Sequence, residues 1–208
     1  MPQSKLSLGL FVMERSYPNF YRRAGFSVPE LLIVVAIVLL VATIAVPNIT
    51  RVIANARMRA SMTSLSGVIQ NCRMVAVKEN KTMTAKMQDF SQGIIGFIKP
   101  AGDNSALKSS DPQVQLQAPI TDHTTPTGAG APAGLTTAVL GFTASTGNPS
   151  FNSRGLPCEY SGGNCPAKGF VRYFKDTSQP NNRSWAAISI SPAGRIKRWF
   201  WNGAAWVE

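Results

Sequence analysis

The sequence has little of what most catalytic and metal sites are made from. Its 208 residues include one histidine, three cysteines and 10 acidic residues, against 21 basic ones. His123 lies in a stretch rich in Thr, Pro and Gly, and the acidic residues show no paired spacing typical of acid–base catalysis or of a metal cage. The composition therefore argues against an enzyme, and we expect neither a cofactor nor a bound metal.

The few cysteines predict one disulfide bond. Cys158 and Cys165 bracket a short polar stretch that could close as a disulfide in an oxidising compartment. Two free thiols are the alternative, whereas zinc requires more ligands than this pair and the distant His123 supply. Cys72 occupies an apolar position of a predicted helix, so we expect a buried free thiol there.

One long apolar run contrasts with the rest of the chain. Residues 26–46 carry a single charge, Glu30, and the basic residues Arg22 and Arg23 precede them. A helix of this length, rising about 1.5 Å per residue, crosses a hydrocarbon core of roughly 30 Å. The preceding cations favour a cytoplasmic start for this helix.

An ordinary secretory signal or a plain anchor explains this run less well. A signal has an apolar core of about 7–15 residues before a small-residue cleavage site, whereas this run is longer and no Ala-x-Ala sequence follows it. A plain anchor has no use for Glu30, because a carboxylate in the membrane costs about 2.5–3.5 kcal/mol. The acid indicates a partner charge from elsewhere.

The start of the run has a distinctive order, Arg22-Arg23-Ala24-Gly25 followed by Phe26-Ser27-Val28-Pro29-Glu30. It resembles the processing site of type IV prepilins and pseudopilins. The resemblance implies that a prepilin peptidase cuts between Gly25 and Phe26 and methylates the new amine of Phe26. It also implies that Glu30 pairs with the terminal amine of a neighbouring subunit. Pro29 departs from many members, although the first turn of a helix tolerates proline.

Cleavage at this point changes the charge of the chain. Removal of residues 1–25, the predicted leader, deletes 4 of the 21 basic and 1 of the 10 acidic residues, which lowers the net charge from +11 to +8. The remaining excess is moderate and spread out. It favours attraction to phosphates or anionic lipids without choosing between them.

The helix is predicted to cross the membrane over residues 26–47 and to continue as an amphipathic segment over 48–80. Pro47 matches a proline of the same family and predicts a kink. Two apolar stripes lie on different faces of the predicted helix, because an α-helix turns by about 100° per residue. We interpret the first as facing neighbouring subunits and the second as covering this subunit's own sheet. Arg51 and Arg59 lie away from the first stripe, on a solvated face or, as the alternative, in a filament ion pair or a ligand site. The first stripe is Ile49, Ile53, Ala56 and Ala60, and the second is Leu65, Ile69, Cys72 and Ala76.

The rest of the chain, residues 81–208, reads as a β-rich globular domain. Alternating and β-branched runs predict strands, and the Thr/Pro/Gly-rich residues 121–134 predict a mobile surface loop. The expected strands are 82–90, 94–99, 114–120, 135–143, 169–175, 185–191, 195–201 and 206–207. The fold class is therefore α+β, a long N-terminal transmembrane helix packed on one C-terminal antiparallel sheet.

Two C-terminal segments add to the resemblance. Phe151-Asn152-Ser153-Arg154-Gly155, followed after a strand by Ile188-Ser189-Ile190-Ser191-Pro192-Ala193-Gly194-Arg195, is similar to the globular domain of FimT/GspH-type pseudopilins. The resemblance implies a pilin fold. It also implies a minor pilin or pseudopilin of a type IV pilus or a type II secretion filament. Such a subunit is held in the bacterial inner membrane, with its C-terminal domain in the periplasm, and its partners are the peptidase and other filament subunits.

The last hairpin offers an alternative partner, DNA. Strand alternation places Arg195, Lys197, Trp199 and Trp201 on one face, with Arg198 adjacent on the other. Cations neutralise phosphates and exposed indoles stack on bases. Some FimT-type proteins are implicated in DNA uptake through a Gly-Arg-x-Arg motif, which this strand matches except that Lys197 replaces the final Arg. The competing interpretation buries the indoles against the helix or the long loop and leaves the charges to protect a sheet edge.

Overall fold

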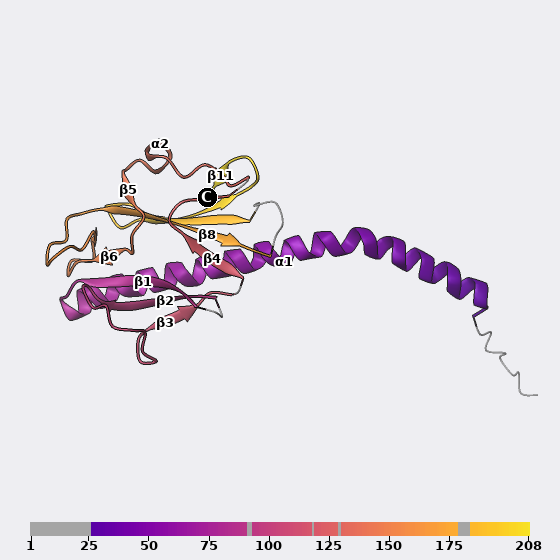
Figure 1. Cartoon of the computed structure of the whole chain (residues 1–208), viewed down its shortest axis with the longest axis horizontal. Helices are drawn as coiled ribbons and strands as arrows, with labels where there is room; N and C mark the ends of the chain where they lie inside the picture. The colour runs from indigo at the N-terminus through magenta and orange to yellow at the C-terminus, as the bar shows by residue number, and fades with distance from the viewer. Residues whose placement is uncertain (1–25, 91–92, 118, 129, 179–183) are drawn as a thin grey trace, which may run out of the picture. The chain divides into compact units, whose positions relative to one another are not determined.

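The computed structural model describes residues 26–90, 93–117, 119–128, 130–178 and 184–208, without the side chains of residues 46–48. The chain divides into two compact units, Met1–Ile44 and Ala45–Glu208, and each is described by itself. The predicted leader and Gly25 lie outside the described residues. Helix α1 (Val28–Glu79) begins in the first unit and ends in the second (Figure 1).

The N-terminal unit consists, where described, of the start of α1. Pro29 lies in its first turn, where the missing N–H would have had no helical partner, and Glu30 lies in the same turn. The helix is long and apolar enough to cross a membrane by length and composition. It continues without interruption through position 47. The kink at Pro47 stays a prediction.

The C-terminal unit contains two mainly antiparallel sheets rather than the single sheet that we expected. The first has the strand order β3-β2-β1-β6-β7, and the second has the order β11-β10-β9-β8-β4. The first sheet comprises β1 (Met83–Phe90), β2 (Gly93–Pro100), β3 (Gln113–Gln115), β6 (Ser150–Phe151) and β7 (Pro157–Cys158). The second comprises β4 (Ile120–His123), β8 (Gly169–Asp176), β9 (Trp185–Ile190), β10 (Ile196–Trp201) and β11 (Trp206–Val207). The short β5 (Ala144–Ser145) pairs with β8 in parallel.

The C-terminal part of α1 packs against both sheets and forms the main core with them (Figure 1). All four residues of the second apolar stripe are fully buried there, as predicted. Burial begins earlier than the stripe, because Ala54, Met58 and Met62 continue the same face toward the N-terminus. The residues of the first stripe are exposed instead, Ile49 by 55% and Ile53 by 44%. Their contact with neighbouring subunits stays a prediction.

Two predicted strands are wrong. Residues 114–120 do not form one strand: the chain leaves the first sheet after β3 and enters the second at β4. Between them the Leu116 N–H donates to the Ile94 carbonyl at 2.8 Å, while the Leu116 side chain is buried in the core. Residues 135–143 contain the short helix α2 (Thr137–Leu140) rather than a strand. Gly141 ends this helix with a φ of 80°, a left-handed conformation that glycine adopts without strain.

A second, smaller core lies on the face of the second sheet that points away from α1. It joins Leu135 to Val171, Tyr173, Trp185, Ala187 and Trp199. The segment predicted as a mobile loop, residues 121–134, begins inside β4 and then leads into this core. It is fastened at its end, because the Trp206 indole donates to the Ala133 carbonyl and the Leu135 N–H donates to the Tyr173 hydroxyl, both at 2.8 Å. The end of this segment therefore packs on the face of the second sheet that carries the smaller core.

Candidate functional site

The start of α1 presents an acid beside an open apolar surface. Phe26 is 80% exposed, and the Glu30 carboxylate accepts the Ser27 N–H at 3.5 Å. An acid in the first turn is favourable, because the N–H groups there carry a partial positive charge. The carboxylate is exposed and can accept an ammonium group from another chain.

The apolar side chains that follow Glu30 are also exposed. Among the described residues in the membrane-length stretch of α1, none is buried inside the structure. Exposed apolar area of this extent marks a surface that lipid or protein covers. The exposed large residues in the N-terminal unit are Phe26, Val28, Leu31, Leu32, Ile33, Val34, Val35, Ile37, Val38, Leu39, Leu40, Val41 and Ile44.

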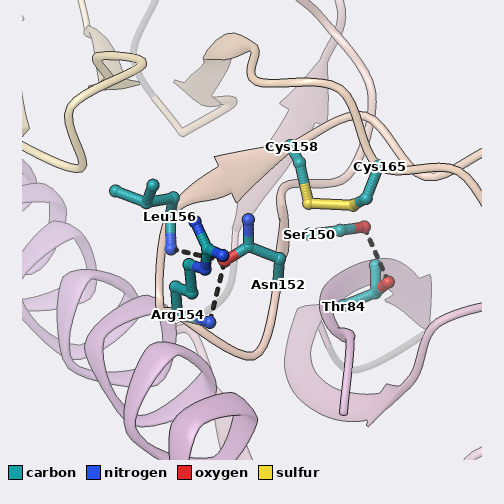
Figure 2. The surroundings of a disulfide bond; sticks show 7 residues. All are labelled: Thr84, Ser150, Asn152, Arg154, Leu156, Cys158 and Cys165. Carbon is teal, nitrogen blue, oxygen red and sulfur yellow. Dashed lines mark hydrogen bonds between the residues drawn. A yellow bond between two sulfur atoms is a disulfide. The ribbon is translucent and has the colours of Figure 1, made fainter. Parts of the chain in front are cut away.

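The disulfide predicted from the sequence is present. Cys158 and Cys165 are bonded, next to the short β6–β7 pair (Figure 2). Cys72 is a buried free thiol, as predicted, and burial raises its pKa to about 12. A thiol of this kind is inert at neutral pH, because only the thiolate reacts.

The turn before the disulfide is shaped by Asn152. Its side-chain oxygen accepts the N–H groups of Arg154 and Leu156, both at 3.0 Å (Figure 2). This closes the turn around Gly155, whose φ of 74° is left-handed. A Cβ at Gly155 would lie 3.0 Å from Cγ2 of Val77, so the turn rests directly on α1. The motif segment 151–155 is therefore a docking turn for the helix.

The second motif segment reaches the same place on α1. A Cβ at Gly194, in the turn between β9 and β10, would lie 3.3 Å from Nη1 of Arg73. A Cβ at Gly155 would lie 3.2 Å from Cγ of the same arginine. Sequence reasoning did not select Arg73, because nothing in its local pattern shows that two distant turns converge on it.

The C-terminal strand alternates as predicted, but its indoles are not free. Ile196 and Phe200 pack against the main core, whereas Trp199 faces the smaller core and is 7% exposed. The Trp199 indole N–H donates to the Ser189 hydroxyl at 2.8 Å, and Trp201 lies against Trp206 with ring centroids 5.6 Å apart. Of the two interpretations of this strand, burial of Trp199 under the segment that leads to Leu135 is the one that the structure shows.

Of the cations in the last hairpin, one is paired with an acid and two are exposed. Lys197 pairs with Glu208 at 2.6 Å, and its ammonium lies 5.1 Å from the Trp199 ring centroid. Arg195 and Arg198 remain exposed. Charge is thus available along β10 even though stacking on Trp199 is not.

A groove of about 400 Å³ runs between α1 and β10, within the C-terminal unit. Arg198 crosses to the helix, where its Nη1 donates to the Thr63 hydroxyl at 2.8 Å. Arg59 reaches back from the helix, with its guanidinium carbon 4.7 Å from the Phe200 ring centroid. Arg59 is exposed, as predicted for a solvated face, but it also lines this groove together with Lys197 and Arg198. We call this feature the basic groove.

Other charged groups of the C-terminal unit serve the fold. Lys99 is 2% exposed, and its ammonium donates to the Ser105 hydroxyl at 2.6 Å and the Ala106 carbonyl at 2.9 Å. The Asp111 carboxylate lies 3.3 Å away and completes the site. The sequence pattern marked Lys99 only as the end of a strand. Within the described ranges, no three residues among His, Cys, Asp and Glu gather as a metal site would require.

His123 ends β4 beside the smaller core. Its ring lies 5.2 Å from that of Trp185, and its Nε2 is 3.1 Å from the Thr121 hydroxyl. Burial and the nearby charge of Lys175 lower the pKa of His123 from its ordinary value. The neutral imidazole is therefore the form that the fold favours.

Comparison of the chain with protein-family models, with curated proteins and with solved structures finds no match. The features that bear on function are therefore the exposed part of the helix, the docking turn and the basic groove.

Proposed function

We propose that this chain is a minor pilin or pseudopilin, processed by a prepilin peptidase and assembled into a filament through its N-terminal helix. The observation that carries the proposal is the double role of α1. Its first part is apolar and exposed over the residues that the structure describes in the N-terminal unit, and its last part is the centre of a folded β unit. Such a helix can be held by a membrane before assembly and by other helices afterwards.

The proposed mechanism depends on the acid at the start of the helix. Cleavage after Gly25 creates a new amine at Phe26, which the peptidase methylates. Glu30 of one subunit then binds the Phe26 amine of its neighbour. The pair offsets the about 2.5–3.5 kcal/mol that a lone carboxylate costs in an apolar layer. Correctly stacked subunits are therefore favoured over slipped ones.

The location follows from the same features. The helix holds the chain in the inner membrane, and the C-terminal unit lies in the periplasm, where the bond between Cys158 and Cys165 can form. A type IV pilus and a type II secretion filament use the same assembly chemistry, so both remain within the proposal.

The first test is the mature N-terminus. The chain is produced in a host that carries a prepilin peptidase and a filament system, and the native product is analysed by mass spectrometry. We expect N-methylated Phe26 at the start. A mature chain that starts elsewhere would contradict the proposal.

The second test is incorporation into filaments. We expect Glu30→Ala to be inserted and cut normally, but to be at least about tenfold depleted from sheared filaments, since loss of the pair exceeds 1.4 kcal/mol. Glu79→Ala, which removes an exposed acid at the other end of α1, is the matched control and should be incorporated normally. Normal incorporation of Glu30→Ala would refute the pairing role.

DNA binding by the last hairpin is the competing proposal. It keeps the cations Arg195 and Arg198 but loses the stacking contribution of Trp199, which is buried.

A further inference from the structure

Helix α1 carries charge of only one sign beyond its first turn. Residues 31–78 include five cations and no aspartate or glutamate, and three of the cations, Arg51, Arg57 and Arg59, lie within nine residues. These three follow the predicted membrane span, which ends at residue 47. Within the described ranges neither Arg51 nor Arg57 forms an ion pair. Their positive charge is therefore left for a ligand outside the chain.

The helical rise sets the distance of each arginine from the end of the span. Because α1 is continuous, Arg51 lies about 6 Å and Arg57 about 15 Å beyond residue 47. The polar layer of a bilayer is about 5–8 Å thick on each side. Side chains on a helix tilt toward its N-terminus, and long cationic side chains extend along apolar surface to reach the headgroups. Both guanidinium groups can therefore reach lipid phosphates.

Arg59 does not belong to this pair. It lies about 18 Å beyond residue 47, outside the polar layer of a bilayer. Its guanidinium carbon is 4.7 Å from the Phe200 ring centroid, so it packs on the C-terminal unit instead.

The directions of Arg51 and Arg57 around the helix favour lipid over a neighbouring subunit. At about 100° per residue, the centre of the first apolar stripe lies about 170° from Arg51 and about 70° from Arg57. A neighbouring helix that packs on this stripe would leave both arginines uncovered. The arginines are also about 120° apart from each other. A layer of headgroups surrounds the helix on every side, so it meets both.

A small cavity lies beside the same part of α1, within the C-terminal unit. Its volume is about 230 Å³, and it is lined by Thr50, Ile53, Ala54, Arg57 and Ser178. The four helical residues have the spacing i, i+3, i+4 and i+7, so they share one face of α1. Arg57 is the one charged residue of this described lining. It lies farther from the predicted span than the apolar Ile53, which is the order of phosphate and acyl chain in a phospholipid.

One acid lies behind the cavity wall, and it is covered. Ser178 donates its N–H at 2.8 Å and its hydroxyl at 2.6 Å to the same carboxylate oxygen of Asp176. Asp176 is only 1% exposed. The cavity therefore presents the guanidinium of Arg57 rather than this carboxylate.

We propose that α1 binds anionic phospholipid where it leaves the membrane, with Arg51 and Arg57 on lipid phosphates and one headgroup in the cavity beside Arg57. A guanidinium donates two parallel hydrogen bonds to phosphate oxygens, and each cation near an anionic surface adds to the attraction. This inference rests on the membrane span of the proposed function and adds the class of lipid that the span selects. It does not involve Glu30 or the Phe26 amine.

The experiment uses the uncut full-length chain in micelles of a neutral detergent. Phosphatidylglycerol and phosphatidylcholine with the same acyl chains are the two lipid probes, because both contain a phosphate but only the first has a net negative charge. Inorganic phosphate is the third probe, with sodium chloride at equal ionic strength beside it. Native mass spectrometry gives the Kd of the first lipid that the chain binds.

We expect the unaltered chain to bind phosphatidylglycerol at least tenfold more tightly than phosphatidylcholine, since two cations act on the charged headgroup. Inorganic phosphate should displace it no better than sodium chloride does. Equal affinity for the two lipids would overturn the proposal. Selective displacement by inorganic phosphate would show a site for free anions and would overturn the choice of a lipid.

Substitutions test the two arginines. Arg51→Gln combined with Arg57→Gln should raise the Kd of phosphatidylglycerol at least tenfold and change that of phosphatidylcholine less than twofold. Arg57→Lys keeps the charge and should stay within about threefold of the unaltered chain. Lys78→Gln combined with Lys81→Gln, at exposed positions near the other end of α1, is the control and should change the Kd less than twofold. Equal losses in the two double variants would refute a specific site.

The cations before the span need their own control. Arg22→Gln combined with Arg23→Gln should change the Kd of the first phosphatidylglycerol less than threefold. A larger loss in this variant than in the variant of Arg51 and Arg57 would place the site at the other end of the span and overturn the proposal. The comparison of the two lipids on the unaltered chain keeps its force even if a variant does not fold.

A separate measurement distinguishes failure of this inference from failure of the proposed function. Alkaline carbonate releases peripheral proteins from membranes but leaves spanning ones in place. A chain that carbonate extracts would contradict the membrane span and, with it, the proposed function. A chain that stays in the membrane but binds the two lipids equally would overturn the lipid site alone.

Discussion

Replacing Gly155 by alanine tests whether the docking turn really bears on the helix. The residue has a φ of 74°, so alanine pays the left-handed penalty of about 1–2 kcal/mol. Its methyl group would also lie 3.0 Å from Val77 and 3.2 Å from Arg73, both on α1. Crowding of a packed contact costs about 1–3 kcal/mol more. We therefore expect the free energy of unfolding to fall by about 2–5 kcal/mol.

Gly162 provides the matched control. Its φ of 54° is also left-handed, but a Cβ there would meet nothing within 4 Å. Gly162→Ala should therefore cost only the backbone term of about 1–2 kcal/mol. Urea unfolding of the full chain in detergent micelles can be followed by tryptophan fluorescence, because all four tryptophans lie in the C-terminal unit. Equal losses for the two variants would refute the contact between the turn and the helix.

Three further predictions concern buried or partly buried groups of the same unit. Lys99→Met should lower the free energy of unfolding by about 3–5 kcal/mol, because it leaves Asp111 and the groups around it without their cation; Lys108→Met, at an exposed position of the same loop, should change it by less than about 0.5 kcal/mol. The lowered pKa of His123 means that the folded chain binds this proton less well than the unfolded chain, so the stabilisation is present above about pH 6.5 and is lost as the pH falls through the folded value. The urea midpoint should therefore fall more between about pH 7.5 and pH 5.5 for the unaltered chain than for His123→Gln. An equal fall for the two proteins would contradict the lowered pKa of His123. Cys72, whose pKa is raised to about 12 by burial, should react with a maleimide only as fast as the unit unfolds, and rapid labelling of the native chain would contradict its burial.

Local patterns predicted most of the elements. The strands 82–90, 94–99, 169–175 and 185–191 correspond to β1, β2, β8 and β9 within a residue or two at most ends. Each of these strands is an apolar or β-branched run that is bounded by turn residues. The local sequence therefore predicts the same strand bounds that the tertiary structure shows. The disulfide between Cys158 and Cys165 was predictable because a short polar stretch joins the two cysteines.

The wrong predictions share a physical cause. The sequence of a single strand does not show which distant segments of the chain pack against it. Residues 114–120 are apolar enough for a strand, yet the buried side chain of Leu116 marks the point where the chain changes sheets. Alternation along β10 correctly separated Ile196 from Trp199. It could not show that a segment some sixty residues earlier, ending at Leu135, covers the tryptophan side.

The same limit explains why the motif segments were recognisable while their role was not. Gly155 and Gly194 lie far apart in the sequence, and each alone reads as an ordinary turn glycine. In the structure both lie beside Arg73 and both have a left-handed φ, but a Cβ at Gly155 would be crowded by Val77, whereas one at Gly194 would meet only the end of the Arg73 side chain. One turn precedes the β7 strand of the first sheet, and the other joins β9 to β10 in the second. A single helical residue therefore meets turns from both sheets, and these glycines are explained by packing on α1 without any ligand.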